Sequence, residues 1–144
     1  MKHITNLSEL FIENIKKLYF AEQQQLKAME LFFEDANAYS LKTAIHAYIN
    51  TKEENIDRLT HIFYAVDITP KAQKCEIINS LVENCRSVIS HAAEKHVSDA
   101  GLISTIQQIN HFNIAGYGTV ASYARALNKT SLSRLMHNAL KAEK

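Results

Sequence analysis

A long amphipathic pattern near the N-terminus most constrains how this chain can fold. Apolar residues recur at steps of three and four from Phe11 to Phe33, which places their side chains on one face of an α-helix. Glu22 lies in the middle of this stripe. An ionised carboxylate on a face that packs into a core needs a positive partner, such as a metal ion or a buried base. The alternative is a polar residue at the edge of the stripe or at a helix boundary, where charge is tolerated.

The remaining sequence predicts further helices. The chain has one proline and three glycines in 144 residues, and 47% of its residues are hydrophobic, so we expect a single all-α domain over residues 1–144. Helices are expected over about residues 7–36, 41–66, 72–93, 98–127 and 131–144. Asn6 and Glu9 have capping-box spacing before the first helix, and Ser98 or Asp99 is expected to cap the fourth. The third helix is too short to span a bundle, so it packs across one end or fills a long connection.

Polar residues also interrupt the apolar stripes of the other expected long helices. Lys52 interrupts the second helix, Asn110 and Asn113 the fourth, and Glu143 ends the stripe of the fifth. Bundle proteins build metal sites in such a layer, from carboxylates on two helices and i,i+3 pairs on the others. The ammonium of Lys52 near Glu22 or Glu143 would satisfy the layer without an ion. Alternatively, Lys52 extends along the stripe to water.

Other residues form no defensible catalytic arrangement. The seven histidines contain no HxxxH or ExxH pair on one helical face, so surface or structural roles are expected. Cys75 and Cys85 lack a zinc or redox spacing and are expected to be free thiols. Tyr117 is predicted to be a core aromatic residue that hydrogen-bonds its hydroxyl. Gly116 and Gly118 fall inside a helix, where they allow close approach at a packing or dimer surface.

Charge and hydropathy argue against several classes of partner. The formal net charge is +1, with acids and bases interspersed, so neither nucleic acid nor an anionic membrane is expected as a partner. No apolar run approaches the roughly 18–20 residues that span a bilayer. Residues 1–10 lack the apolar segment of a signal peptide, so we expect a cytoplasmic protein.

Three segments resemble the YciE/YciF family of ferritin-like, stress-associated bacterial proteins. They are ELFIENIKKLYFAEQQQLKAM (Glu9–Met29), AIHAY followed by IDRLTHIF in the second expected helix, and INHFNIAGYGTV (Ile109–Val120). The Lys74–Cys75 pair also matches a pair in the family. The resemblance covers essentially the whole chain. It implies a ferritin-like four-helix bundle with an additional short helix, a homodimer and, for many members, a carboxylate site for two metal ions.

The chain departs from the family where the metal ligands would lie. Glu22 and Glu143 match glutamates of the family, but Asn110 and Asn113 stand where the family has glutamates. Two divalent ions need several anionic oxygen ligands to balance their charge. Two carboxylates and two amides are a poor set for that purpose.

Two functional interpretations follow. In the first, the layer is a degenerate metal site in which Lys52 replaces the metal, no cofactor is bound, and the protein has a non-enzymatic structural or interaction role. In the second, the protein binds and oxidises iron or manganese through Glu22 and Glu143, with Glu53 or Glu54 as possible further ligands.

Overall fold

The computed structural model describes residues 3–72 and 75–144, and its secondary structure over these ranges consists of five α-helices. The helices are α1 (Leu7–Asp35), α2 (Tyr39–Ala65), α3 (Glu76–His91), α4 (Lys95–Ala126) and α5 (Thr130–Glu143). The predicted all-α fold is confirmed. The third helix was expected to begin at about Ala72, but Ala72 is not helical and α3 begins at Glu76. Lys74, which was compared with the family together with Cys75, lies outside the described residues. None of the described helices is long and apolar enough to cross a membrane.

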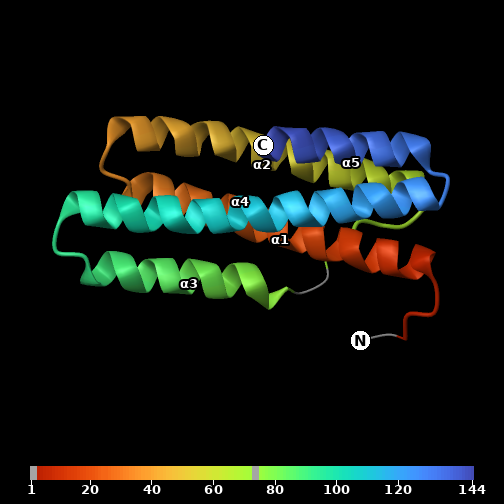
Figure 1. Ribbon diagram of the computed structural model, residues 1–144, viewed down its shortest axis with the longest axis horizontal. Helices are drawn as coiled ribbons and strands as arrows, with labels where there is room; N and C mark the ends of the chain where they lie inside the picture. The colour runs from red at the N-terminus through yellow and green to blue at the C-terminus, as the bar shows by residue number, and fades with distance from the viewer. Residues whose placement is uncertain (1–2, 73–74) are drawn as a thin grey trace.

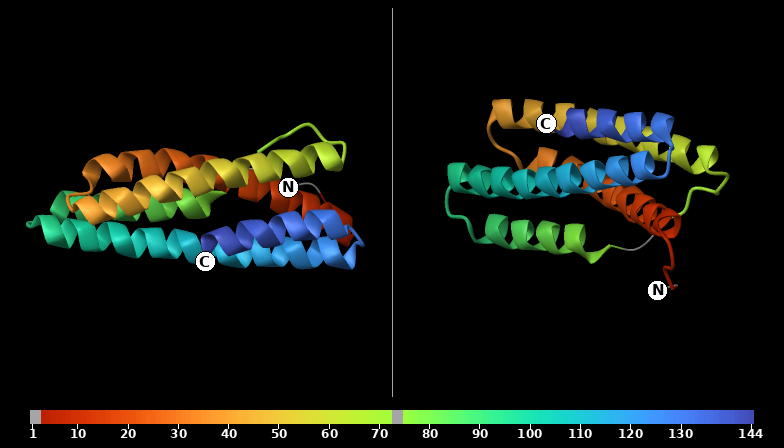
Figure 2. Two further views of the ribbon diagram at one scale, coloured as in Figure 1. Left: turned by 90° about the horizontal axis from the view of Figure 1, so that it is seen from above. Right: turned by 45° about the vertical axis from the view of Figure 1, so that its right-hand side comes forward.

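Two antiparallel helix pairs, α1 with α2 and α4 with α5, form the bundle (Figure 1). The short helix α5 runs beside the C-terminal half of α4, and α3 runs beside its N-terminal half on another side (Figures 1 and 2). The third helix therefore lies in the connection between α2 and α4, which was one of its two predicted positions. It follows the long axis of the bundle and does not pack across an end.

The hydrophobic core is divided into two clusters along the bundle axis. The first joins the start of α1 and the ends of α2 and α4 to α5, and includes Phe11, Phe63 and Met136. The second joins the end of α1 and the starts of α2 and α4 to α3, and includes Phe32 and Leu102. The helical segments between these clusters carry most of the buried polar residues.

Two helices are rotated slightly from the predicted stripes. In α1, Phe32 is fully buried and Phe33 only half-buried, although Phe33 was assigned to the core. In α4, the stripe through Asn110 predicts a buried Ile103, but Leu102 is fully buried and Ile103 is 45% exposed. Both errors involve adjacent apolar residues, about 100° apart around a helix, between which the periodicity of one sequence cannot choose.

Gly116 allows a close approach between α4 and α1, as predicted. A methyl group at this position would lie 2.8 Å from Leu18 Cδ2. At Gly118 the nearest atom to such a methyl group is Leu140 Cδ2, at 3.9 Å. This is an ordinary van der Waals distance, so packing against α5 does not require a glycine there.

One predicted helix cap is confirmed and one is wrong. The side chain of Asn6 accepts a hydrogen bond from the backbone N–H of Glu9 at 2.9 Å, which caps α1. The fourth helix begins at Lys95, so Ser98 and Asp99 lie within its first turns and do not cap it. Both side chains are nevertheless buried.

Asp99 instead caps the neighbouring helix α2. Its Oδ1 and Oδ2 accept the backbone N–H groups of Asn37 and Ala38, each at 2.9 Å, and Ala38 is the N-cap residue of α2. This contact supplies acceptors that the alanine side chain cannot. A tertiary contact thus replaces a local capping residue.

Asp99→Ala is expected to lower the free energy of unfolding at pH 7 by about 0.5–2 kcal/mol, through loss of this cap. Burial raises the pKa of Asp99, but the hydrogen bonds from the N–H groups of Asn37 and Ala38 lower it by more. The pKa of Asp99 therefore falls below its ordinary value of 3.8. The contribution is therefore present above pH 3.8 and lost as the pH falls through the folded-state pKa. Urea unfolding at several pH values, with the exposed Glu53→Ala as control, checks this; equal effects in the two variants would contradict it.

Candidate functional site

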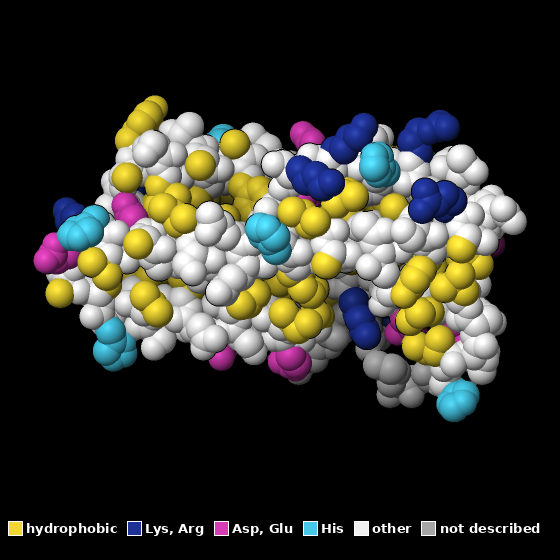
Figure 3. All heavy atoms as spheres, viewed as in Figure 1, with side chains coloured by type: hydrophobic (Ala, Val, Ile, Leu, Met, Phe, Trp, Pro, Cys, Tyr) yellow, Lys and Arg dark blue, Asp and Glu magenta, His cyan; other side chains and the backbone are white. Residues whose placement is uncertain are grey.

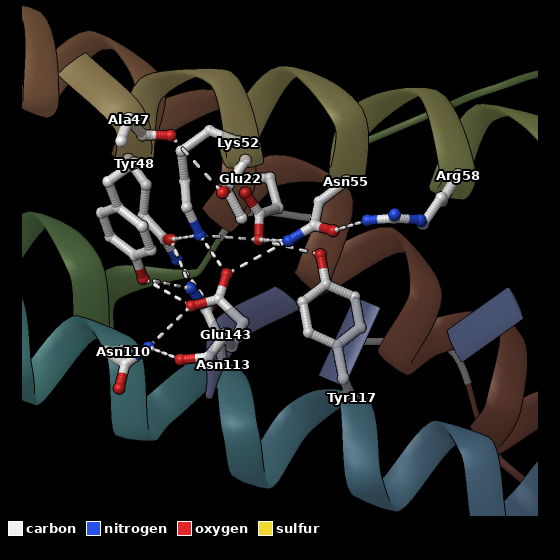
Figure 4. Close-up of polar contacts among 12 residues, drawn as sticks. Glu22, Ala47, Tyr48, Lys52, Asn55, Arg58, Asn110, Asn113, Tyr117 and Glu143 are labelled. Atoms are coloured by element: carbon white, nitrogen blue, oxygen red, sulfur yellow. Dashed lines mark hydrogen bonds and ion pairs between the residues drawn. The ribbon is translucent and has the colours of Figure 1, made fainter. Parts of the chain in front are cut away.

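Glu22 lies in the middle of α1 with its side chain fully buried (Figure 4). Its Oε1 accepts hydrogen bonds from Tyr117 Oη at 2.8 Å, Lys52 Nζ at 3.2 Å and Asn55 Nδ2 at 3.5 Å. Its Oε2 is buried and has no hydrogen-bond partner among the described residues. Glu22 is therefore a core residue, and the alternative of a polar residue at a stripe edge or helix boundary is wrong.

Lys52 of α2 is also fully buried. Its Nζ donates to Glu143 Oε1 at 2.5 Å, Gln25 Oε1 at 3.1 Å and Glu22 Oε1, so an acceptor is available for each ammonium hydrogen. The same ammonium lies 4.3 Å from the centroid of the Tyr48 ring, a cation–π contact. The side chain does not reach water, and the ammonium bridges the two carboxylates that the sequence singled out.

Glu143 brings the end of α5 into this network. Its Oε2 accepts from Tyr48 Oη at 2.5 Å and Asn110 Nδ2 at 3.0 Å, and its Oε1 accepts from Asn55 Nδ2 at 3.1 Å as well as from Lys52. A carboxylate near a helix C-terminus is disfavoured by the helix dipole. The Lys52 ammonium offsets this, which explains how the second-last residue of the chain is only 4% exposed.

A reciprocal amide pair completes the layer between α1 and α4. Gln25 Nε2 donates to Asn113 Oδ1 at 2.9 Å, and Asn113 Nδ2 donates to Gln25 Oε1 at 2.7 Å. Since Gln25 Oε1 also accepts from Lys52, the amide pair is joined to the charged network. We use "polar layer" below for the following residues: Glu22, Gln25, Tyr48, Lys52, Asn55, Asn110, Asn113, Tyr117 and Glu143.

The sequence pattern identified some of these residues and missed others. The predicted hydrogen bond of the buried Tyr117 hydroxyl is confirmed. Gln25 and Asn55 were missed, although each follows a recognised layer residue, Glu22 or Lys52, at i+3, the spacing that brings side chains onto one helical face. That spacing is the signal that would have identified them.

The remaining candidate residues lie away from the polar layer. Glu53 and Glu54 are exposed on α2, and Glu54 pairs at 3.8 Å with Arg58, so these glutamates are not positioned with Glu22 and Glu143 as further ligands. All seven histidines are exposed. The two cysteines are free thiols, one buried and one half-buried.

The polar layer, as arranged, does not fit a two-metal site. The positive group between Glu22 and Glu143 is the ammonium of Lys52, and the nearby amide nitrogens donate to the carboxylates. Throughout the described ranges, no group of three or more His, Cys, Asp or Glu side chains converges as metal ligands would. The unpartnered Glu22 Oε2 is a single oxygen, fewer than a hard divalent cation requires.

A surface groove leads to this layer between α2 and α4. It has a volume of about 410 Å³ and is lined by apolar side chains together with Tyr48, Gln107, Asn110, Glu143 and Lys144. One edge of the otherwise buried network is therefore adjacent to solvent.

Comparison with known proteins agrees with this architecture. Residues 6–144 match the model of a family described as a domain of unknown function, DUF892. The chain belongs to this family. It is 27% identical to protein YciF of Escherichia coli K12 over 143 residues, which is 99% of this chain and 86% of YciF. The resemblance to the YciE/YciF family is thereby confirmed.

Solved structures of family relatives superimpose closely. YcfI of Rhodopseudomonas palustris matches with a TM-score of 0.95 and 26% identity, covering 99% of this chain and 90% of the other. The E. coli stress protein YciF matches with a TM-score of 0.91 and 27% identity, covering 97% and 89%. This chain therefore shares its helical bundle with both solved structures along nearly its whole length.

Burial controls the ionisation of the layer. Desolvation raises the pKa of Glu22 above its ordinary value of 4.5, Lys52 lowers it, and Glu143 raises it again. Desolvation and the nearby carboxylates also raise the pKa values of Tyr48 and Tyr117, so both hydroxyls remain donors. Because two carboxylates share one ammonium, the charge of Glu143 and the burial of Glu22 both act against ionisation of Glu22.

The raised pKa of Glu22 predicts a pH dependence of stability. The folded state holds a proton on Glu22 that the unfolded chain releases above about pH 4.5, so stability falls as the pH rises from 4.5 through the folded-state pKa. Glu22→Gln has no proton to lose and is expected to flatten this part of the profile. Urea unfolding between pH 4.5 and 8 measures the difference, and parallel profiles for the two proteins would contradict it.

Proposed function

We propose that this chain is a YciF-like, stress-associated protein whose polar layer is a degenerate metal site with a structural role. The observation that carries the proposal is the Lys52 ammonium, which is bonded to both Glu22 and Glu143 in a fully buried position. Coulomb repulsion with that ammonium disfavours a divalent cation between the same carboxylates. We further propose that the protein acts without catalysis, by binding other proteins.

The layer would set the alignment of four helices. It draws side chains from α1, α2, α4 and α5, and it lies between the two hydrophobic clusters. Sliding one helix along another would separate groups such as Gln25 and Asn113 and leave them buried without partners. A buried polar layer can thereby specify register even where an apolar layer would give equal or greater stability.

Two relatives support a stress-associated, structural role. YciF is described as a stress protein and YcfI as a candidate structural protein. We extend these roles to this chain because the bundle is shared along nearly its whole length. By the same resemblance we propose a cytoplasmic homodimer.

Metal content after anaerobic Fe(II) reconstitution and desalting tests the proposal. We expect close to zero iron per chain, and the same result with Mn(II). One or two ions bound per chain would overturn the degenerate site. A Glu22→Gln/Glu143→Gln variant measured beside it would show whether any bound ion depends on the polar layer.

The second candidate function is metal binding with metal oxidation. Two observations favour it: the buried Glu22 Oε2 lacks a partner among the described residues, and the groove between α2 and α4 reaches Glu143. A metal would have to displace Lys52 from both carboxylates. Stoichiometric iron in the native protein, lost in the double glutamine variant, would establish this function in place of the first.

A further inference from the structure

The last third of the chain differs in charge from the rest. Residues 100–144 contain five Lys or Arg residues and a single acid, Glu143, for a formal charge of +4; residues 1–99 therefore account for −3 of the net +1. The single acid is buried in the polar layer and engaged there. Although acids and bases are interspersed over the whole sequence, the exposed charged side chains of residues 100–144 are therefore all cationic.

These cations gather on the outer face of α5 and the adjoining end of α4. Arg134, His137 and Lys141 follow one another at steps of three and four, so they form one exposed stripe on α5. The C-cap residue Lys144 is also exposed, as is Arg125 on α4. Dark blue side chains with a histidine among them lie over α5 in Figure 3. No ion pair between these cations and a carboxylate is found among the described residues.

A cavity opens between α4 and α5 at one end of this stripe. Its volume is about 480 Å³, within the range of small-molecule sites. Its charged and hydroxyl-bearing lining residues are Ser122, Arg125, Thr130, Ser133, Arg134 and His137. The Ser133 hydroxyl already donates its hydrogen to the Ala121 carbonyl at 2.9 Å. The hydroxyl groups of Ser122 and Thr130 are the donors that the cavity offers to an anion.

The first turn of α5 adds positive potential to the same cavity. Thr130, its first residue, lines the cavity, and the N-cap residue Lys129 makes no side-chain capping hydrogen bond. The positive end of a helix dipole attracts anions. Two arginines, two hydroxyls and this helix end are donors suited to the several oxygens of a phosphate group, which arginine binds with two parallel hydrogen bonds.

We propose that the cavity between α4 and α5 binds a soluble, phosphate-bearing small molecule with more than one phosphate. One phosphate group lies between Arg125 and Arg134, and further negative charge follows the stripe toward Lys141 and Lys144. This site is separate from the polar layer and does not depend on its proposed role. It would allow the protein to respond to a multiply charged metabolite.

The charge distribution favours a short anion over a nucleic acid. A long polyanion that extends past the stripe would meet the surface formed by residues 1–99, a part of the sequence with a formal charge of −3. The cavity-lining residues also include no Phe, Tyr or Trp side chain on which a base would stack. A compact anion is attracted by the cationic stripe and does not reach the negatively charged part of the surface.

Titration calorimetry with inorganic tripolyphosphate, at about 0.01 M and 0.15 M ionic strength, tests the proposal. We expect saturable binding of one molecule per chain, weakened by at least about tenfold in Arg125→Gln/Arg134→Gln. Arg86→Gln, which changes an exposed arginine on α3, should leave the affinity unchanged. Circular dichroism establishes that each variant is folded.

Three outcomes would overturn the proposal. They are no saturable binding of tripolyphosphate, equal loss of affinity in the Arg86 control, and tighter binding of duplex DNA or phosphoinositide-containing vesicles that survives the double substitution. The metal measurements above do not bear on these results, so the two proposals fail independently.

Discussion

Lys52→Met is expected to reduce the free energy of unfolding by about 3–5 kcal/mol, because it leaves two buried carboxylates without their cation. Methionine keeps the apolar length of the lysine stem, so the loss reports the charge more than the packing. Glu22 and Glu143 would then repel each other in a desolvated layer. Since whole domains are stable by only about 5–15 kcal/mol, this single change approaches global unfolding.

Urea unfolding at pH 7 measures this loss, and lower pH should reduce it. In the variant, Glu22 lacks the ammonium that lowers its pKa, so its pKa lies still further above the ordinary value and stability recovers as the pH falls toward about 5. Lys27→Met, an exposed lysine on α1, is the control and should change stability by no more than about 0.5 kcal/mol. If Lys52→Met were as stable as this control, the ammonium would not hold the layer together.

Acidic substitutions at the layer are expected to create a metal site. In Asn110→Glu/Asn113→Glu/Lys52→Glu, the cation is gone and three carboxylates join Glu22 and Glu143, which supplies the negative charge that divalent ions need. Without metal the variant should be strongly destabilised, since buried like charges repel. With Fe(II) or Mn(II) we expect one or two ions per chain and a melting temperature that rises with metal concentration.

Thermal unfolding with and without Mn(II), together with metal analysis after desalting, checks the expectation. Mg(II) at the same concentration separates a specific site from general charge screening, because Mg(II) loses its water more reluctantly. Native protein treated identically is the reference. A triple variant with no more metal than the native protein would show that the layer is not a modified metal site.

The α-helical bundle was readable from the sequence because each helix carries an apolar stripe with a period near 3.6 residues. The polar residues that interrupt these stripes were readable for the same reason: Glu22, Lys52, Asn113 and Glu143 are all buried. The choice between adjacent apolar residues was not readable, as Leu102 and Ile103 show. Burial there depends on the rotation of α4 against α1 and α3.

The sequence by itself determined that charged residues share the apolar faces of their helices, because helical periodicity sets which residues lie on one face. Their burial was decided by the tertiary structure. Only the tertiary structure decided which charges meet. Lys52 and Glu143 are 91 residues apart, and no local pattern reports that α5 ends beside the middle of α2. The helix cap supplied by Asp99 to α2 across 61 residues is a second case. Both contacts arise from how helices pack against one another, which is fixed by side-chain shape along whole interfaces and not by the spacing within one helix.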